Sequence, residues 1–157
     1  MKTTNLILIL IVVVSLMSCK NQMHVVTLYV DTANITKNSI DEYANFNQPK
    51  GISNEDFTIH VRKGDLVIWN ALSISDEPVE VNITAIIDEP GPRDDDPDKK
   101  YVNFFDGKTL SPDKIKTRTV IGTLKNGKPG DIQKYKLHFT VKDKVDTFII
   151  DPKMEMN

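Results

Sequence analysis

The residues of this chain that could do chemistry are one cysteine, three histidines and a run of aspartates. Thiolate and imidazole groups are the ligands that copper and zinc prefer, whereas carboxylates suit calcium. His60 and His138 fall on outward positions of expected strands, and His24 lies near the start of another. Two imidazoles alone make a weak metal site, to which Met154 or Met156 could add a soft donor. Ordinary surface histidines are the default interpretation, and a metal-handling function stays open as an alternative.

The aspartates belong to a polar loop, "DEPGPRDDDPDKK", over residues 88–100. Asp94, Asp96 and Asp98 have the spacing with which calcium loops start, because a hard cation needs several carboxylate oxygens. An EF-hand would also need glycine at position 99 and glutamate at position 105, and the chain has Lys99 and Phe105 there. A solvated loop between strands is therefore favoured, with calcium binding as the alternative.

Composition excludes several classes of function. The chain has 157 residues, with 22 acidic against 20 basic side chains, so its net charge gives no reason to expect nucleic acid as a partner. The sequence contains no Gly-x-Ser-x-Gly elbow, no His-Glu-x-x-His motif and no phosphate-binding glycine loop. We therefore predict one globular domain that is not an enzyme and holds no cofactor.

The single cysteine follows an apolar segment close to the start of the chain. Lys2 precedes the apolar run at 6–14, and Leu16-Met17-Ser18-Cys19 follows it. A positive start, a short apolar run and small residues are typical of a secretory signal peptide, and the run is shorter than the roughly 20 residues of a membrane-spanning helix. An ordinary signal peptide that happens to contain a cysteine is the alternative to the interpretation that follows.

The four residues Leu16-Met17-Ser18-Cys19 resemble the lipobox of bacterial lipoproteins. The resemblance implies cleavage between Ser18 and Cys19 and attachment of diacylglycerol to the Cys19 thiol, so that this thiol is neither a copper ligand nor a nucleophile. Lys20, rather than aspartate, follows Cys19, which by enterobacterial sorting rules implies the outer membrane, facing the periplasm. The expected partners are the membrane, through the lipid, and an unknown envelope protein or glycan.

Beyond Cys19 the hydrophobic pattern predicts short strands separated by turns. A polar connection at 32–55 includes a short helical turn at Ile40 and Tyr43. We expect residues 1–18 to be the signal peptide, 19–22 a lipidated tether, 23–152 the domain and 153–157 a tail. The pattern predicts an all-β fold, an antiparallel Greek-key β-sandwich with an immunoglobulin-like sandwich as the alternative. The expected strands cover residues 23–31, 57–62, 66–72, 79–87, 101–105, 117–125, 132–142 and 145–150.

Two segments resemble the cupredoxin family over residues 57–151. The turn Lys63-Gly64-Asp65 leads into "LVIWN" at 66–70, and Pro129-Gly130 precedes "YKLHF" at 135–139. The family holds copper through two histidines, a cysteine and usually a methionine, a set that stabilises both oxidation states of the metal. The matched ligand positions here hold Val79 and Phe139. The resemblance therefore implies a cupredoxin-like domain without copper.

The leading hypothesis for function is an envelope-anchored lipoprotein with a binding or structural sandwich of unknown ligand. One alternative is a periplasmic protein that handles copper or calcium. Another is an adhesion-type sandwich that binds glycan or protein, which would need exposed aromatic side chains. The candidates for those side chains are Tyr43, Phe46, Tyr101, Phe104 and Phe105.

Overall fold

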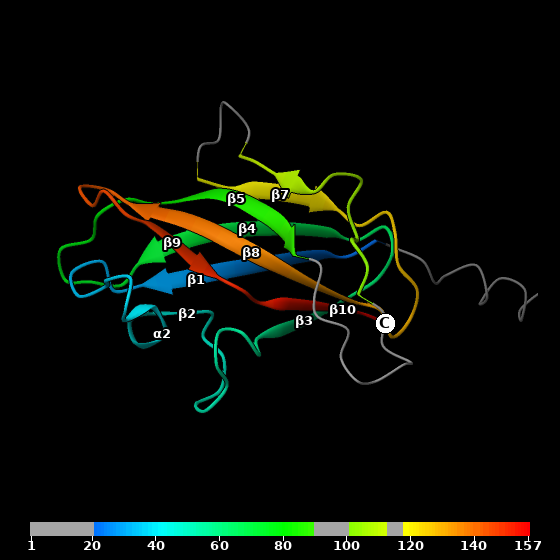
Figure 1. Ribbon diagram of the computed structural model, residues 1–157, viewed down its shortest axis with the longest axis horizontal. Helices are drawn as coiled ribbons and strands as arrows, with labels where there is room; N and C mark the ends of the chain where they lie inside the picture. The colour runs from blue at the N-terminus through cyan, green and yellow to red at the C-terminus, as the bar shows by residue number, and fades with distance from the viewer. Residues whose placement is uncertain (1–20, 90–100, 113–117) are drawn as a thin grey trace, which may run out of the picture.

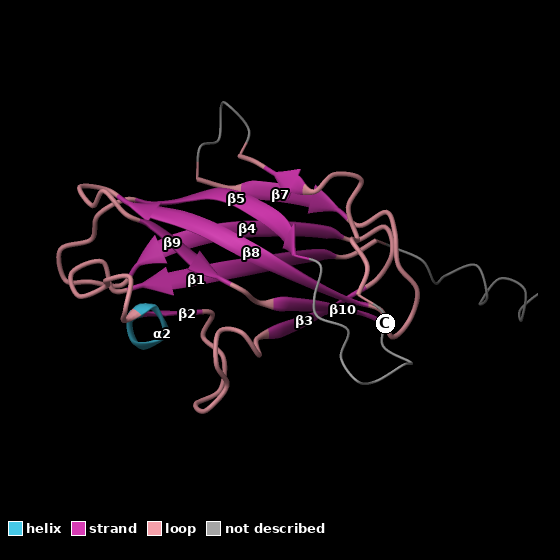
Figure 2. Cartoon of the chain, in the orientation of Figure 1, coloured by secondary structure: helices cyan, strands magenta, loops and turns pink. Residues whose placement is uncertain are grey.

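The computed structural model describes residues 21–89, 101–112 and 118–157, which form two packed β-sheets (Figure 1). Figure 2 shows that strands and loops dominate this part of the chain. The elements in chain order are β1 (Met23–Val30), α2 (Ile40–Tyr43), β2 (Ala44–Asn45), β3 (Thr58–Val61), β4 (Leu66–Ser73), β5 (Val81–Glu89), β6 (Thr109–Leu110), β7 (Val120–Thr123), β8 (Ile132–Val141), β9 (Thr147–Ile150) and β10 (Lys153–Met156).

The strands form a sheet A with the order β2-β1-β4-β7 and a sheet B with the order β3-β10-β8-β5-β6. In sheet B, β9 also pairs with β8, along the part of β8 that β10 does not reach. The predicted all-β sandwich is confirmed, but its sheets are not purely antiparallel as the sequence predicted. Both sheets are mixed, because β1 runs parallel to β4 and β3 runs parallel to β10, while the other strand pairs are antiparallel.

The core lies between the two sheets and is built by alternation of inward and outward side chains along β1, β4 and β8. In β8, Tyr135, Leu137 and Phe139 are fully buried, as the pattern at 132–142 predicted. Trp69 of β4 is also fully buried, and its ring packs edge-on against Tyr135 of the opposite sheet, with ring centroids 5.7 Å apart. Its Nε1 donates a hydrogen bond to the Tyr135 hydroxyl at 3.2 Å. The polar atoms of these two large buried side chains are therefore hydrogen-bonded to each other.

A β-bulge in β5 changes which of its residues face the core. Continuous alternation from Val79 predicted that Ala85 and Ile87 would point inward. The structure has a register shift between Ile83 and Ala85 against β8, and beyond it Ile86 is the buried residue. An extra residue in one strand reverses the phase of the alternation, so the inward prediction for Ala85 and Ile87 is wrong.

Two segments differ from their predicted form. Residues 101–105 were expected as a strand, but in the structure only Tyr101 makes an isolated bridge, to Ile132, and the segment is otherwise irregular. Residues 153–157 were expected as a tail, whereas Lys153–Met156 form β10 between β3 and β8. Met154 and Met156 are buried there, because their side chains face the core from this inserted strand.

The short helical turn predicted at Ile40 and Tyr43 is confirmed as α2. It lies in the connection between β1 and β3, beside the two-residue strand β2 (Figure 1). No helix within the described ranges is long and apolar enough to cross a membrane.

Candidate functional site

Apolar side chains stand at the two positions that match copper ligands in the cupredoxin family, which the sequence resembles. Phe139 is fully buried on β8 and stacks on Phe148 of β9, with ring centroids 5.1 Å apart and an interplanar angle of 23°. Val79 is partly buried and packs against the same core. Neither side chain has a donor atom for a metal, and the stacked phenyl rings occupy the space between the strands.

Hydrogen bonds join the loops at this end of the sandwich. The Thr32 hydroxyl, which is buried, lies 2.8 Å from the hydroxyl of Ser73 and 3.0 Å from that of Ser75. The Ser75 hydroxyl also donates to Asp31 at 2.8 Å, and hydrogen bonds from the side chains of Asn34 and Ser75 hold the pKa of Asp31 below its usual value. These contacts tie the loop after β1 to the loop after β4, in a structural rather than a catalytic arrangement.

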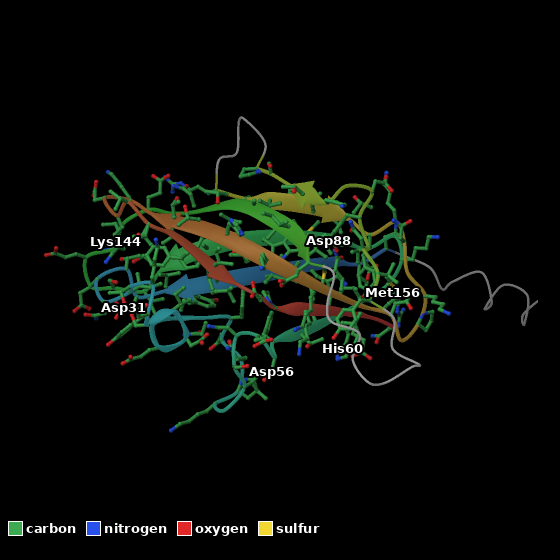
Figure 3. The ribbon with its side chains drawn as sticks, viewed as in Figure 1. Asp31, Asp56, His60, Asp88, Lys144 and Met156 are labelled. Carbon is green, nitrogen blue, oxygen red and sulfur yellow. The ribbon has the colours of Figure 1, made fainter. Side chains whose placement is uncertain are left out.

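A lysine closes the same end from the β8–β9 turn. The Nζ of Lys144 donates a hydrogen bond to the carbonyl oxygen of Ile35 at 3.0 Å. Figure 3 shows Lys144 and Asp31 together at one end of the sandwich, with Met156 at the other. Three loops from different strands are thereby linked at this end of the sandwich.

The structure does not bring the candidate histidines together. His60 is exposed on β3 and pairs with Glu155 of β10, which in turn pairs with Ile132 of β8. His138 lies six residues further along β8, which is roughly 20 Å of strand. Among the described residues, no three His, Cys, Asp or Glu side chains gather in a way that could hold a metal ion. Met154 is fully buried in the core and pairs with Ile59, so its side chain points to the face of the sheet opposite to that of His60.

His24, the third histidine, belongs to a cluster around Asp65 that sequence reasoning missed. The Asp65 side chain is only 2% exposed and accepts hydrogen bonds from the backbone N–H of Gln22 at 2.7 Å and of Arg62 at 2.9 Å. The Nε2 of His24 lies 2.8 Å from the carboxylate oxygen Oδ2 of Asp65. We call Gln22, His24, Arg62 and Asp65 the Asp65 clasp, since together they fix the start of β1 to the β3–β4 turn.

The turn itself makes the clasp possible. Gly64 has a φ of +94°, a conformation that favours glycine, and the Asn21 side chain lies against it. A Cβ at Gly64 would fall 2.7 Å from the Asn21 Oδ1. The sequence signal was the Lys63-Gly64-Asp65 turn, which marks the bend, but the partner residues come from a strand about 40 positions earlier.

The aromatic side chains proposed for glycan contact lie mainly in the core. Phe104 is fully buried, Phe105 is 4% exposed and packs edge-on against Trp69, and Phe46 stacks on Phe57 with ring centroids 4.4 Å apart. Tyr43 and Tyr101 are partly buried, and Tyr43 packs against the core. An exposed aromatic platform is not formed by these residues.

An open cleft of about 400 Å³ lies between the segment around α2 and the end of β9. Burial raises the pKa of Asp151, and the negative charges of Glu89 and Glu55 raise it further. Asp41 accepts a hydrogen bond from Asn54, and Glu55 forms an ion pair with Lys134 at 3.2 Å. The cleft thus combines one carboxyl group of raised pKa, Asp151, with one carboxylate held by a hydrogen bond and another held by an ion pair. Its lining residues are Lys37, Asn38, Ser39, Ile40, Asp41, Glu42, Asn54, Glu55, Ile149, Ile150 and Asp151.

Two predicted sites lie outside the described residues. These are the lipidation and cleavage position at Ser18 and Cys19, and the loop that carries Asp94, Asp96 and Asp98. Their assignments stay predictions.

Comparison with known proteins gives a narrow result. No protein-family model matches the sequence, and no curated protein matches it. Among solved structures, a blue copper oxidase from Nitrosomonas europaea is similar over 85% of this chain and 43% of its own, with 16% identity and a TM-score of 0.32. The chain therefore spans less than half the length of that protein.

Proposed function

We propose that this chain is an envelope-anchored lipoprotein whose cupredoxin-like sandwich has a binding or structural role and holds no blue-copper centre. The observation that carries the second half of the proposal is the burial of Phe139 and its stacking on Phe148, at the position where the resembling family has a ligand. The first half rests on the signal-like order of Lys2, the apolar run and Ser18-Cys19. The proposal includes no catalytic activity.

The Asp65 clasp supports a short connection between lipid and domain. Gln22 is already hydrogen-bonded to Asp65, so only residues 20 and 21 separate the proposed lipidated Cys19 from the clasped chain. Fully extended, the four residue-to-residue steps from Cys19 to Met23 span at most about 14 Å. A protein anchored in this way holds its sandwich close to the bilayer, at the outer membrane facing the periplasm if Lys20 acts as in enterobacterial sorting.

Replacing Cys19 with alanine is expected to abolish lipidation. In cells given a labelled fatty acid, the variant should carry no label and should move from the membrane to the soluble fraction, because the thiol is the attachment atom. Ser18→Ala, which keeps a small residue before the cut, serves as the matched control and should remain labelled. A Cys19→Ala protein that still carries label and still sediments with membranes would contradict the anchor.

Copper addition tests the proposal that the domain holds no blue-copper centre. Titrating the detergent-purified full-length protein with Cu(II) is expected to give no intense visible band of the kind that thiolate-to-copper charge transfer produces, since the one thiol of the sequence, Cys19, is the proposed lipid site. A blue copper protein measured in parallel provides the positive control. A strong visible band that saturates at one copper per chain would favour the metal-handling alternative.

A further inference from the structure

We propose that the outer face of sheet A lies against the surface of the bilayer to which the chain is anchored, an inference that rests on the lipid anchor proposed above. The face is defined by six apolar side chains, Met23, Val25, Leu66, Ile68, Leu72 and Ile121. Four of them are large hydrophobic residues with high exposure: Met23 at 64%, Val25 at 59%, Leu72 at 54% and Ile121 at 46%.

Five of the six side chains form one continuous surface because of the strand register, while Leu72 pairs with Tyr29 and is separated from Ile68 by the polar Asn70. Met23 pairs with Leu66 and Val25 with Ile68 across the parallel β1–β4 ladder, and Ile68 pairs with Ile121 across β4–β7. Paired residues point to the same side of a sheet. The hydrophobic side chains are therefore neighbours rather than scattered exposures, and such contiguous apolar patches mark interaction sites.

The face carries no charge at its strand positions. The other outward residues of β1, β4 and β7, all of which the structure describes, are Thr27, Tyr29, Asn70 and Thr123. None of them would have to lose a charge on leaving water, which is the main cost of placing a protein surface against lipid. Tyr29 adds a ring with a polar tip, which suits the boundary between headgroups and acyl chains.

The opposite face of the sandwich is strongly charged. On β8 the outward positions include Lys134 and Lys136, which form ion pairs with Glu55 at 3.2 Å and with Glu89 at 2.8 Å. Lys153 of β10 pairs with Asp56 at 3.3 Å. The molecule thus has one uncharged and one charged outer face, a polarity that gives it a preferred orientation at an interface.

The position of the anchor selects the bilayer as the occupant of the uncharged face. Met23, the first residue of β1, is both a member of the face and within about 14 Å of Cys19 along the chain. A tether this short keeps the bilayer at a high effective concentration beside the face. Lys63, exposed in the turn before Leu66, and Lys128, exposed in the β7–β8 connection, are suited to anionic headgroups at the same end.

Single introduced cysteines test the orientation in the lipidated full-length protein. Val25→Cys places a thiol on the sheet A face, and Thr147→Cys places one at an exposed outward position of β9 in sheet B. Because lipid occupies Cys19, the introduced thiol is the one that reacts with a polarity-sensitive fluorophore. Both proteins are reconstituted into phosphatidylethanolamine–phosphatidylglycerol vesicles, with and without lipids that carry a nitroxide quencher.

The label at position 25 should shift to the blue and be quenched several-fold more than the label at position 147. Adding Ile121→Glu to the Val25→Cys protein should remove most of that quenching, because a carboxylate resists transfer to the interface. Equal, weak quenching at both positions in vesicle-bound protein would overturn the inference and leave the anchor intact. Crosslinking of position 25 to position 25 of another copy, without quenching, would show that a second chain covers the face and would also overturn it.

Failure of the anchor has a different signature. A protein that incorporates no fatty acid and does not float with vesicles would remove the proposed function, and the orientation with it. A protein that is labelled and floats, but is not quenched at position 25, removes the orientation alone.

Discussion

Replacing Phe139 with alanine is expected to lower the free energy of unfolding by about 3–5 kcal/mol, out of a total of roughly 5–15 kcal/mol for a domain. Phe139 is fully buried and stacked on Phe148 at 5.1 Å, so its removal leaves a cavity and takes away an aromatic contact. The one cysteine of the sequence is the proposed lipid site, so no disulfide within the chain offsets this loss. Urea unfolding followed by the fluorescence of Trp69 measures the change.

His138→Ala is the matched control for this substitution. The two residues are adjacent on β8, but His138 points to the outer face of sheet B and pairs with Ala85 and Ile149. Its removal should change the unfolding midpoint little. Similar small losses in the free energy of unfolding from both variants would mean that position 139 does not face the core. The match between Phe139 and a copper-ligand position would then be wrong.

Replacing Asp65 with alanine is expected to cost about 2–4 kcal/mol, because each buried donor left without a partner costs about 1–3 kcal/mol. The donors are the backbone N–H groups of Gln22 and Arg62, with His24 as a third partner. The start of β1 should also open locally. Hydrogen exchange at the amide of Gln22 measures that opening, and Asp76→Ala, at an exposed position after β4, serves as the control.

The Asp65 clasp also predicts how stability depends on pH. Burial alone would raise the pKa of Asp65, but hydrogen bonds from Gln22, His24 and Arg62 outweigh it and hold the pKa below the usual value of 3.8. A carboxylate whose folded pKa is depressed stabilises the fold above the unfolded pKa and loses that contribution as pH falls through the folded value. Asp65→Asn should therefore remove part of the stability lost on acidification below about pH 4. An unchanged acid limb in urea titrations would contradict the clasp.

Which side chains face the core was predicted best for strands whose inward and outward residues alternate without interruption. In β8 the alternation of lysine or histidine with Tyr135, Leu137 and Phe139 leaves one way to bury the apolar face, and the structure has it. In β5 the same reasoning failed beyond Ile83, because a bulge adds a residue without any change in residue type. The residue types along a strand determine that its side chains alternate between two faces. Where a bulge interrupts this alternation depends on how the strand pairs with the neighbouring strand.

The candidate sites show the same division. That apolar residues, Val79 and Phe139, stand at the positions matched to copper ligands could be read from the sequence, whereas the Asp65 clasp depends on contacts between residues far apart in sequence. Phe104 and Phe105 were candidates for exposed aromatic side chains on a segment that was predicted as a strand. They are buried because the segment docks on β8, where the Phe104 N–H donates to the Gln133 side chain at 3.0 Å.

The strand β10 has a consequence for when the chain can fold. Met154 pairs with Ile59, about 95 positions earlier, so β3 emerges during synthesis long before its hydrogen-bonding partner. Contacts of such long range slow folding, because a large loop must close before they contribute. Sheet B therefore cannot be completed until residues 153–156 have been made, and the unfinished edge of β3 would need protection from aggregation in the meantime. In the exported lipoprotein proposed above, this late step would keep the sandwich from closing before the chain has crossed the membrane.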